Sequence, residues 1–416
     1  MKRALSLLLA GTLSLSLLAG CSAGPATEQL STEPISLTAQ ELSTHGPDTQ
    51  NACDALSAFG LKLLQSTEQT GESTLLSPLS VTLALSMAAN GAEGETLAQF
   101  QEALGGVSLE ALNAACQSLL SDYRQLGGST RASIANSLWV DPEGQISETF
   151  IGRCIGSYGA EVFQGELSSS GIVHDVNRWV SKQTKGLIPE LVQQPFPEDT
   201  AALLINALYL NNTWDLEFDP ISTHPRKFTH SGGQVEQMDF LHHSFTDLLY
   251  LQGEGAQGVV LPYDDGRLAF VAILPDSPDL RGWLDSLDGN VLSQLVQGAE
   301  EQRFFRLAFP KFEAEWSGSL QEMLTDMGLE AAFTPGLADF SRMGDRSNGY
   351  YLSEVLHAAK LQVNEKGTEA AAATLLGAGS GAPPPDEGIE LLLDRPFLYG
   401  IFDRQNGLPL FLGTFE

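Results

Sequence analysis

The chain has 416 residues, of which 43% are apolar, and its 52 Asp and Glu residues against 22 Lys and Arg residues give a formal net charge of −30. A chain of this length and apolar content can bury a large core. Its negative charge argues against nucleic acids, heparin-like polyanions and acidic membrane surfaces as partners, because like charges repel, and we attribute the charge to solubility.

Residues 1–20 have the pattern of a secretory signal peptide, because Lys2 and Arg3 precede an apolar run that ends in Leu18-Ala19-Gly20-Cys21. A cysteine directly after such a cleavage site resembles the lipobox of bacterial lipoproteins, in which Cys21 is lipidated. A plain secretory signal and a short membrane anchor are the alternatives. No other stretch is long and apolar enough to span a membrane. We expect an extracytoplasmic protein that is held at the bacterial cell membrane only through Cys21, or is secreted.

The next segment, residues 21–48, is rich in Ser, Thr, Pro, Glu and Gln and lacks periodicity, which predicts a flexible tether. Beyond Cys21 the cysteines are Cys53, Cys116 and Cys154, and an odd number cannot be fully paired within one chain. Cys116 falls on the apolar face of a helical pattern, so we expect it to be a small core residue. No disulfide framework and no thiol catalyst are expected.

From residue 49 to 416, helical and strand-like patterns alternate without a repeat or a linker, which predicts one large domain of the mixed α/β (α+β) class. A helical pattern begins at Ala52. Ser77-Pro78 opens a second helix, because serine is a favoured N-cap and proline is tolerated at the first helical position. This helix is apolar almost all round, which predicts burial. Strand-like runs follow at 136–140, 258–263, 268–274 and 304–312, and a further helix at 319–327.

Signs of an enzyme or a metal site are weak. His242 and His243 are neighbours, so on a strand they would point to opposite faces, and no third ligand sits at a helpful spacing. The chain has no His-Glu-x-x-His, no Gly-x-Ser-x-Gly and no glycine-rich phosphate loop. We therefore expect no metal, no cofactor and no catalytic residues.

The segment 365–396 differs in composition from the rest of the chain. Small residues fill 367–373, and no Lys or Arg lies between Lys366 and Arg395. Alanine favours helix, but the run is only about one turn long and glycines follow it, so an isolated helix would be marginal. Pro383–Pro385 then stiffen the backbone. We expect a long surface loop, and loops of this length in compact domains are usually functional or disordered.

The flanks of this loop resemble the serpins. Asn364–Thr374 resembles the hinge of the serpin reactive loop, and the family's C-terminal signature is matched by Asp394-Arg395-Pro396-Phe397, Gly407 and Phe411-Leu412-Gly413. Further matches are residues 90–96, 176–188 and 206–220, the last a central strand that runs up to Trp214. The resemblance covers the chain from about residue 50. It implies the serpin fold, with a large central β-sheet, further sheets, surrounding helices and an exposed reactive-centre loop over about residues 365–394.

The resemblance also implies a function. In serpins a target protease attacks the loop and forms an acyl-enzyme, and the cut loop inserts into the central sheet and distorts the protease. This protein would then be a monomeric inhibitor that forms a covalent complex with a serine protease. The implied hinge residues are Glu365, Gly367, Thr368, Glu369, Ala370, Ala371, Ala372, Ala373 and Thr374. Those that alternate with Thr368 are small, which suits insertion, and we expect Thr368 to enter the sheet first after cleavage.

Two further residue sets follow from the resemblance. Trp214, Lys311 and Glu365 match the breach, where the loop first enters the sheet, with Lys311 as the ion-pair partner of Glu365. The shutter, where strands part, is matched by Ser77, Ser80, Asn206 and His357. These four could also be taken for pieces of a hydrolase, but we favour a buried hydrogen-bond cluster, because buried polar groups normally need partners.

The usual loop length in the family places the reactive bond at Gly381-Ala382, within a range that also includes Ala378, Gly379 and Ser380. The absence of Lys and Arg excludes trypsin-like targets, whose pocket carries a carboxylate. Small residues suit elastase-like or subtilisin-like proteases.

Three other functions stay open. A non-inhibitory serpin that acts as a surface binding or structural protein, and a plain protease substrate, would both be cleaved without forming a stable complex. A lipid-anchored hydrolase would need a nucleophile and base that the sequence does not offer. The hinge has neither proline nor bulky residues, which favours inhibition. Heparin should not accelerate it, because residues 108–126 carry Glu110 and Asp122 against Arg124 alone.

Overall fold

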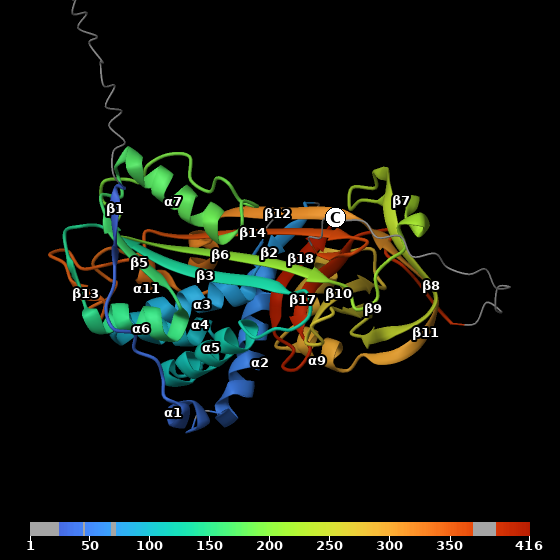
Figure 1. The fold of residues 1–416 in the computed structure, drawn as a ribbon, viewed down its shortest axis with the longest axis horizontal. Helices are drawn as coiled ribbons and strands as arrows, with labels where there is room; N and C mark the ends of the chain where they lie inside the picture. Colours follow the sequence, from blue (N-terminus) through green and yellow to red (C-terminus); the bar gives the residue numbers. More distant parts are fainter. Residues whose placement is uncertain (1–24, 45, 68–71, 369–387) are drawn as a thin grey trace, which may run out of the picture.

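Two large β-sheets carry the fold of the computed structural model, which describes residues 25–44, 46–67, 72–368 and 388–416 (Figure 1). The first sheet has seven strands in the described residues. In order across the sheet they are β1 (Thr27–Leu30), β5 (Glu161–Gly165), β3 (Arg131–Val140), β6 (Ala202–Thr213), β15 (Gly367–Thr368), β14 (Glu354–Asn364) and β12 (Phe312–Ser319).

The second sheet lies at one end of the molecule, around β8 and β11. Its order is β16 (Ile389–Leu392), β11 (Glu300–Pro310), β8 (Val235–Gly253), β9 (Ala256–Pro262), β10 (Leu268–Pro275), β17 (Phe397–Asp403), β18 (Pro409–Phe415) and β2 (Thr74–Leu76), while β7 (His224–Thr229) pairs with β8. A short pair, β4 (Gln145–Ile146) and β13 (Gly344–Asp345), completes the described strands.

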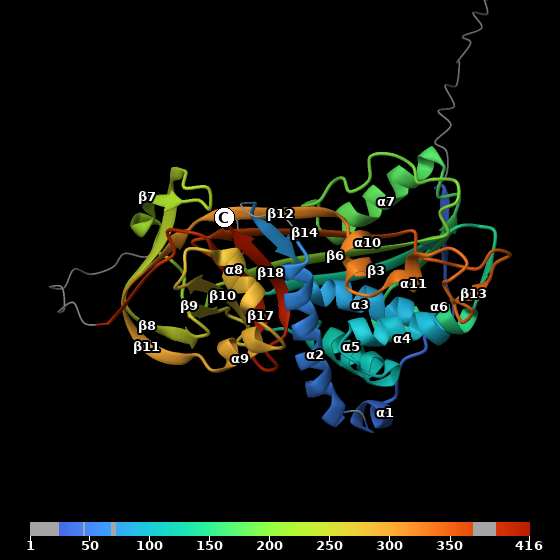
Figure 2. The ribbon, with the colours of Figure 1, turned by 180° about the vertical axis from the view of Figure 1, so that it is seen from behind.

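Helices cover both faces of the seven-stranded sheet, as both views show (Figures 1 and 2). On one side lie α2 (Gly46–Gln65), α3 (Pro78–Ala89), α4 (Gly94–Ala103), α5 (Leu109–Tyr123) and α6 (Glu148–Tyr158), and on the other α7 (Ser170–Gln183). The shorter helices are α1 (Ala39–Thr44), η1 (Pro220–Ser222), α8 (Leu280–Ser286), α9 (Val291–Gln297), α10 (Gln321–Asp326) and α11 (Glu330–Phe333). Among the described residues, no helix is both long and apolar enough to cross a bilayer.

The buried helix α3 and the buried strand β6 show why the core forms here. Every residue of α3 is buried, as its all-round apolar pattern predicts, and Ser77 caps it by accepting a hydrogen bond from the Ser80 N–H. Alternate side chains of β6 enter two different cores, with Leu204 facing the α3 side and Leu203 packing with the buried face of α7. The mixed α/β class and the central sheet predicted from the sequence are confirmed.

The run 304–312, predicted as one strand, is divided between the two sheets. β11 ends at Pro310 and β12 begins at Phe312, so Lys311 sits at the corner where the chain passes from one sheet to the other. Its backbone N–H donates to the carbonyl of Asp239, 2.8 Å away. Hydrophobic pattern alone could not reveal this corner, because both halves of the run are buried on at least one face.

Residues 25–44 correct the described part of the flexible tether that was predicted over residues 21–48. β1 pairs antiparallel with β5 at the edge of the seven-stranded sheet, and Thr27 donates from its N–H and its hydroxyl to Asp175, both at 3.1 Å. The segment lies close against α6, where a Cβ at Gly156 would collide with the backbone of Ile35. Composition missed this because backbone pairing and polar side chains hold the segment together with isolated apolar residues such as Leu30, which packs against the core without forming a periodic pattern.

The cysteines agree with their predicted role. Cys53, Cys116 and Cys154 are free and buried, and Cys116 lies in α5 with no exposed surface. Burial raises the pKa of both Cys53 and Cys116 to about 12, so neither supplies a reactive thiolate at neutral pH.

Candidate functional site

The seven-stranded sheet is parted at one end. β6 and β14 run parallel and pair directly, from Leu203 opposite Glu354 to Leu208 opposite Ala359. Beyond this ladder β15 lies between the two strands and pairs antiparallel with both, with Thr368 opposite Asn212 and Val363. The strands β6 and β14 are therefore hydrogen-bonded to each other along one stretch. Beyond it, the two residues of β15 separate them.

Both residues of β15 fit closely between their neighbours. A Cβ at Gly367 would collide with the carbonyl oxygen of Asn212 on β6, so only glycine allows this approach. Thr368 has no exposed surface. The sequence led us to expect that Thr368 would be the first loop side chain to enter the sheet after cleavage, and this expectation is wrong, because Thr368 already lies inside the sheet of the intact chain.

Trp214 fastens the turn that leads from β14 into β15. Its indole Nε1 donates to the carbonyl of Asn364, and its backbone N–H donates to the carbonyl of Lys366, both at 2.8 Å. The ring stacks on Tyr263, with centroids 5.0 Å apart and planes 6° apart, and only 2% of the residue is exposed. Trp214, which directly follows β6, thus fixes the turn that leads into β15.

Glu365 is bound by Lys311, at the corner between the two sheets, and by the segment that connects β6 to β7. Lys311 Nζ lies 2.9 Å from its carboxylate, Thr223 donates from its hydroxyl at 3.0 Å, and the Phe218 N–H donates to its carbonyl at 2.8 Å. Burial by itself raises the pKa of the Glu365 carboxyl, but the hydrogen bonds led by that of Lys311 outweigh it and hold this pKa below its ordinary value. The carboxylate is therefore charged at neutral pH and joins the corner at Lys311 to the turn before β15.

Charge reversal at Glu365 should loosen this junction. We expect Glu365→Lys to lose the Thr223 hydrogen bond, to set two ammonium groups against each other, and to lower stability by about 1–3 kcal/mol. Monomer yield by gel filtration and protease inhibition should both decrease. Glu313→Lys is the matched control, because Glu313 is exposed on β12 and has no ion pair among the described residues. Unchanged yield and inhibition in Glu365→Lys would contradict the role of the junction.

Ser77, Ser80 and His357 meet in the core beneath the sheet, and none has any exposed surface. The Ser77 N–H donates to Nε2 of His357 at 3.0 Å, while the Ser77 hydroxyl donates to the carbonyl of Leu410 at 2.7 Å. Burial lowers the pKa of His357 to about 3, so its ring is neutral, and because Nε2 accepts, the proton lies on Nδ1. The imidazole does not activate the serine hydroxyl, so the pair is not a hydrolytic dyad.

Asn206 lies beside this cluster but is bonded elsewhere. It is the ladder partner of His357, yet its amide donates to Oδ1 of Asn136 on β3, 2.6 Å away. Within the part of the chain that the structure describes, neither Asn206 Oδ1 nor His357 Nδ1 has a partner, although both are buried. One hydrogen-bond acceptor, Asn206 Oδ1, and one donor, His357 Nδ1, are therefore unpaired where β6 pairs directly with β14.

Some predicted residues lie outside the described part of the chain. These are Cys21, the hinge residues Glu369, Ala370, Ala371, Ala372, Ala373 and Thr374, and the reactive-bond range Ala378, Gly379, Ser380, Gly381 and Ala382. Sequence reasoning also missed partners that the fold supplies. Thr223, Asn136 and Tyr263 carry no local signal, because each contacts its partner only across segments that are distant in sequence.

Comparison with known proteins identifies the family. A family model described as "Serpin (serine protease inhibitor)" matches residues 54–416. The chain is 30% identical to Serpin-Z2B of Triticum aestivum over 377 residues, which cover 85% of this chain and 93% of that protein. The crystal structure of the thermophilic serpin tengpin in the native state is similar with a TM-score of 0.79 and 31% identity, covering 92% of this chain and 95% of that one. The complex of thyroxine-binding globulin with thyroxine shares the fold, with a TM-score of 0.77 at 24% identity, covering 87% and 98%. The chain therefore belongs to the serpin family.

Proposed function

We propose that this serpin inhibits serine proteases as a suicide substrate, by cleavage of the loop after β15 and insertion of that loop into the seven-stranded sheet. The observation that carries the proposal is the position of Gly367 and Thr368, which already form a strand between β6 and β14. A loop that continues this strand has one direct path, which runs between β6 and β14 and opens their ladder as it advances.

Insertion has a clear source of free energy. The parallel ladder between β6 and β14 would be replaced by two antiparallel ladders, one on each side of the new strand, so the sheet would gain backbone hydrogen bonds. The residues that alternate with Thr368 up to Thr374 are small, and no proline precedes Pro383, so each residue of this stretch can donate its N–H to a ladder. Small side chains also avoid overpacking of the two cores that face β6.

The shutter cluster favours opening of the closed ladder. Asn206 Oδ1 and His357 Nδ1 are buried without partners among the described residues, and an unpaired buried polar group costs about 1–3 kcal/mol. Separation of β6 from β14 would let both groups find new partners. The intact form would then persist for kinetic reasons, as an inhibitor of this kind requires, because insertion must outrun deacylation.

We place the reactive bond at Gly381-Ala382, within the range 378–382, and the target among elastase-like or subtilisin-like proteases. Glycine, alanine and serine in this range suit a shallow specificity pocket, and no Lys or Arg lies between Lys366 and Arg395 to serve a trypsin-like enzyme.

The direct test is incubation with elastase or subtilisin, with trypsin as the matched control, followed by denaturing electrophoresis. We expect a covalent complex of serpin and protease with the first two enzymes and none with trypsin. The mass of the released C-terminal peptide should place the cut between residues 378 and 382. Complete cleavage without a complex would overturn inhibition and favour a binding role, of the kind that thyroxine-binding globulin has in its complex with thyroxine.

We propose that the mature protein is tethered outside the cytoplasm through a lipid on Cys21. The signal Leu18-Ala19-Gly20-Cys21 supports this. Cys21→Ser should block processing or move the protein from the membrane pellet to the soluble fraction, as measured by fractionation and immunoblotting. Cys53→Ser is the control and should leave the distribution unchanged. Full membrane retention of a processed Cys21→Ser protein would rule out the lipid anchor.

A further inference from the structure

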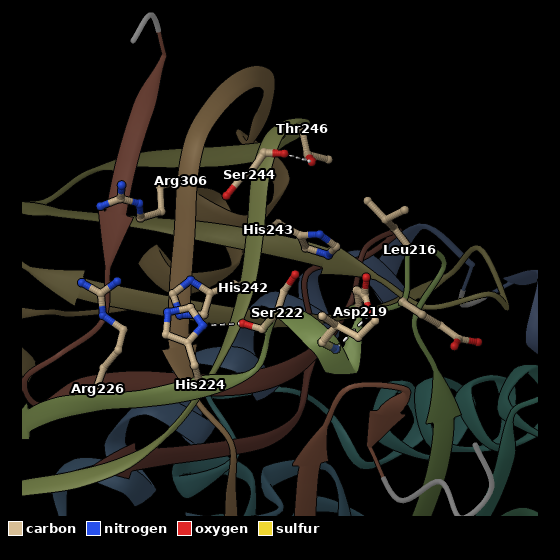
Figure 3. Close-up of a pocket in the computed structure, with 12 residues that line it drawn as sticks. Leu216, Asp219, Ser222, His224, Arg226, His242, His243, Ser244, Thr246 and Arg306 are labelled. Atoms are coloured by element: carbon tan, nitrogen blue, oxygen red, sulfur yellow. Dashed lines mark hydrogen bonds between the residues drawn. The ribbon is translucent and has the colours of Figure 1, made fainter. Parts of the chain in front are cut away.

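A hollow of about 840 Å³ lies beside the corner where β7, β8 and β11 meet (Figure 3). The turn that connects β6 to β7 forms its other wall, through Leu216, Asp219, Ile221 and Ser222. A volume in this range suits a small organic molecule rather than a lone inorganic ion. None of the residues that hold Glu365 or β15 lines the hollow.

One end of the hollow gathers basic side chains. The rings of His224 and His242 stack with centroids 4.0 Å apart, and Figure 3 shows Arg226 and Arg306 beside them, from the strands on either side of β8. Burial, together with the charges of His224, Arg226 and Arg306, lowers the pKa of His242 to about 4. In a chain with 22 Lys and Arg against 52 Asp and Glu, such a cluster is unusual.

Arg226 has no ion-pair partner and the Nε2 atom of His242 has no hydrogen-bond partner among the described residues. His242 is 8% exposed, and its Nε2 is buried with no hydrogen-bond partner among the described residues. Within the same residues, no carboxylate lies in ion-pair distance of Arg226. Arg306 pairs with Glu390 at 2.7 Å, but that carboxylate is itself half exposed. An anion in the hollow would give Arg226 an ion-pair partner, share the Arg306 guanidinium group with Glu390, and accept a hydrogen bond from the orphaned imidazole nitrogen.

The turn between β6 and β7 gives the hollow an apolar wall. Leu216 and Ile221 lie on this turn, are strongly exposed, at 48% and 74%, and both line the hollow. The acidic lining residues of the turn are Glu217 and Asp219, and Asp219 accepts a hydrogen bond from the N–H of Ile221 at 2.9 Å. The hollow thus has basic side chains on its strands and apolar side chains on its turn.

We propose that this hollow binds a small organic anion, with its carboxylate or phosphate group at Arg226, His242 and Arg306 and its apolar body against Leu216 and Ile221. A metal ion does not fit, because the described residues contain no group of three or more His, Cys, Asp or Glu side chains arranged to hold one. A nucleic acid does not fit a chain with a net charge of −30.

Isothermal titration calorimetry tests the site directly and does not depend on inhibition. Phenyl phosphate carries both the anion and the apolar ring, inorganic phosphate carries only the anion, and benzyl alcohol only the ring. We expect saturable binding of phenyl phosphate at one site, weaker binding of phosphate, and none of benzyl alcohol. Absence of saturable phenyl phosphate binding up to about 10 mM, a limit near the weakest useful affinity, would overturn the proposal.

Variants locate the binding. Arg226→Gln should weaken phenyl phosphate binding at least about tenfold, because a charge-assisted hydrogen bond is lost. Ile221→Ser should weaken phenyl phosphate but not inorganic phosphate. Arg303→Gln is the matched control, because Arg303 lies on the same strand as Arg306, is exposed, pairs with Asp247 and does not line the hollow. Equal affinities in Arg226→Gln and Arg303→Gln would place the binding elsewhere and refute the assignment.

Occupation of the hollow should also slow loop insertion, a consequence that rests on the proposed function. Phe218 lies in the turn that lines the hollow. The centroid of its ring lies 4.0 Å from that of His243, which lines the hollow, and its N–H donates to the Glu365 carbonyl. With saturating phenyl phosphate, we expect a larger fraction of cleaved serpin per covalent complex, in the parent but not in Arg226→Gln. Measured binding with an unchanged fraction would refute this coupling and leave the binding site standing.

Discussion

Replacement of Thr368 by arginine should convert the protein from an inhibitor into a substrate. Thr368 is fully buried between Asn212 on β6 and Val363 on β14. A guanidinium group there would enter the packed core around Tyr263, and an unpaired buried charge costs several kcal/mol. The loop would therefore be expelled from the sheet and its insertion slowed, whereas the reactive bond itself would be unaltered. Deacylation would then be faster than loop insertion, and the protease would be released.

The measurement compares covalent complex with cleaved product at equal protease dose, and we expect the ratio to fall at least about tenfold, as a cost of about 1.4 kcal/mol or more implies. Thr368→Val is the matched control. Its side chain has nearly the same shape and adds no charge, and it removes only the hydroxyl that faces the buried Tyr263 hydroxyl, so the complex should form as in the parent. If Thr368→Arg forms the complex as efficiently as Thr368→Val, loop insertion is not the mechanism.

Acid should destabilise the intact protein between pH 6.5 and about pH 3. Burial lowers the pKa of His357 to about 3 and contributes most to lowering the pKa of His242 and His243 to about 4, from an ordinary value of 6.5. In this window the unfolded chain binds protons that the folded chain excludes. Stability therefore rises with pH across the window and falls as acid is added. His357 alone should account for about 3–5 kcal/mol over the full window.

Urea unfolding at pH 7.5, 6, 5 and 4 measures this effect. His357→Gln keeps an acceptor for the Ser77 N–H but removes the titrating ring, so its free energy of unfolding should depend less on pH than that of the parent. His174→Gln is the control, because His174 is exposed on α7 and should leave the dependence unchanged. Equal pH dependence in His357→Gln and the parent would show that the buried histidine is not the acid-sensitive group.

Local patterns predicted the elements that carry their own signal. The all-round apolar run after Pro78 became the buried helix α3, and the serine before it became the cap. The resemblance of Asn364–Thr374 to a serpin hinge directed attention to the segment that enters the sheet at Gly367. The predicted partners Lys311 and Glu365 lie 2.9 Å apart. These inferences depended on a short stretch of chain or on a family motif.

Other features could not be read from the sequence, because they depend on contacts between distant segments. The pairing of Thr27 with Asp175 joins residues 148 positions apart, and no periodicity marks a polar strand that is held by its backbone. The depth of insertion at Thr368 was also missed, since a hinge motif does not say how far its strand has entered. Only the register with β6 and β14 reveals that the sheet is already parted.

Comparison of the intact and the cleaved protein tests the central claim, that the loop inserts between β6 and β14. The loop would be cut with subtilisin, and the cleaved serpin separated from the covalent complex by gel filtration. Its cut would be confirmed by mass between residues 378 and 382, and the intact and cleaved forms unfolded in guanidinium chloride. Insertion adds a strand with two antiparallel ladders, so the midpoint of the cleaved form should rise by at least about 1 M. An unchanged or lower midpoint after complete cleavage would mean that the loop stays outside the sheet and would contradict the account.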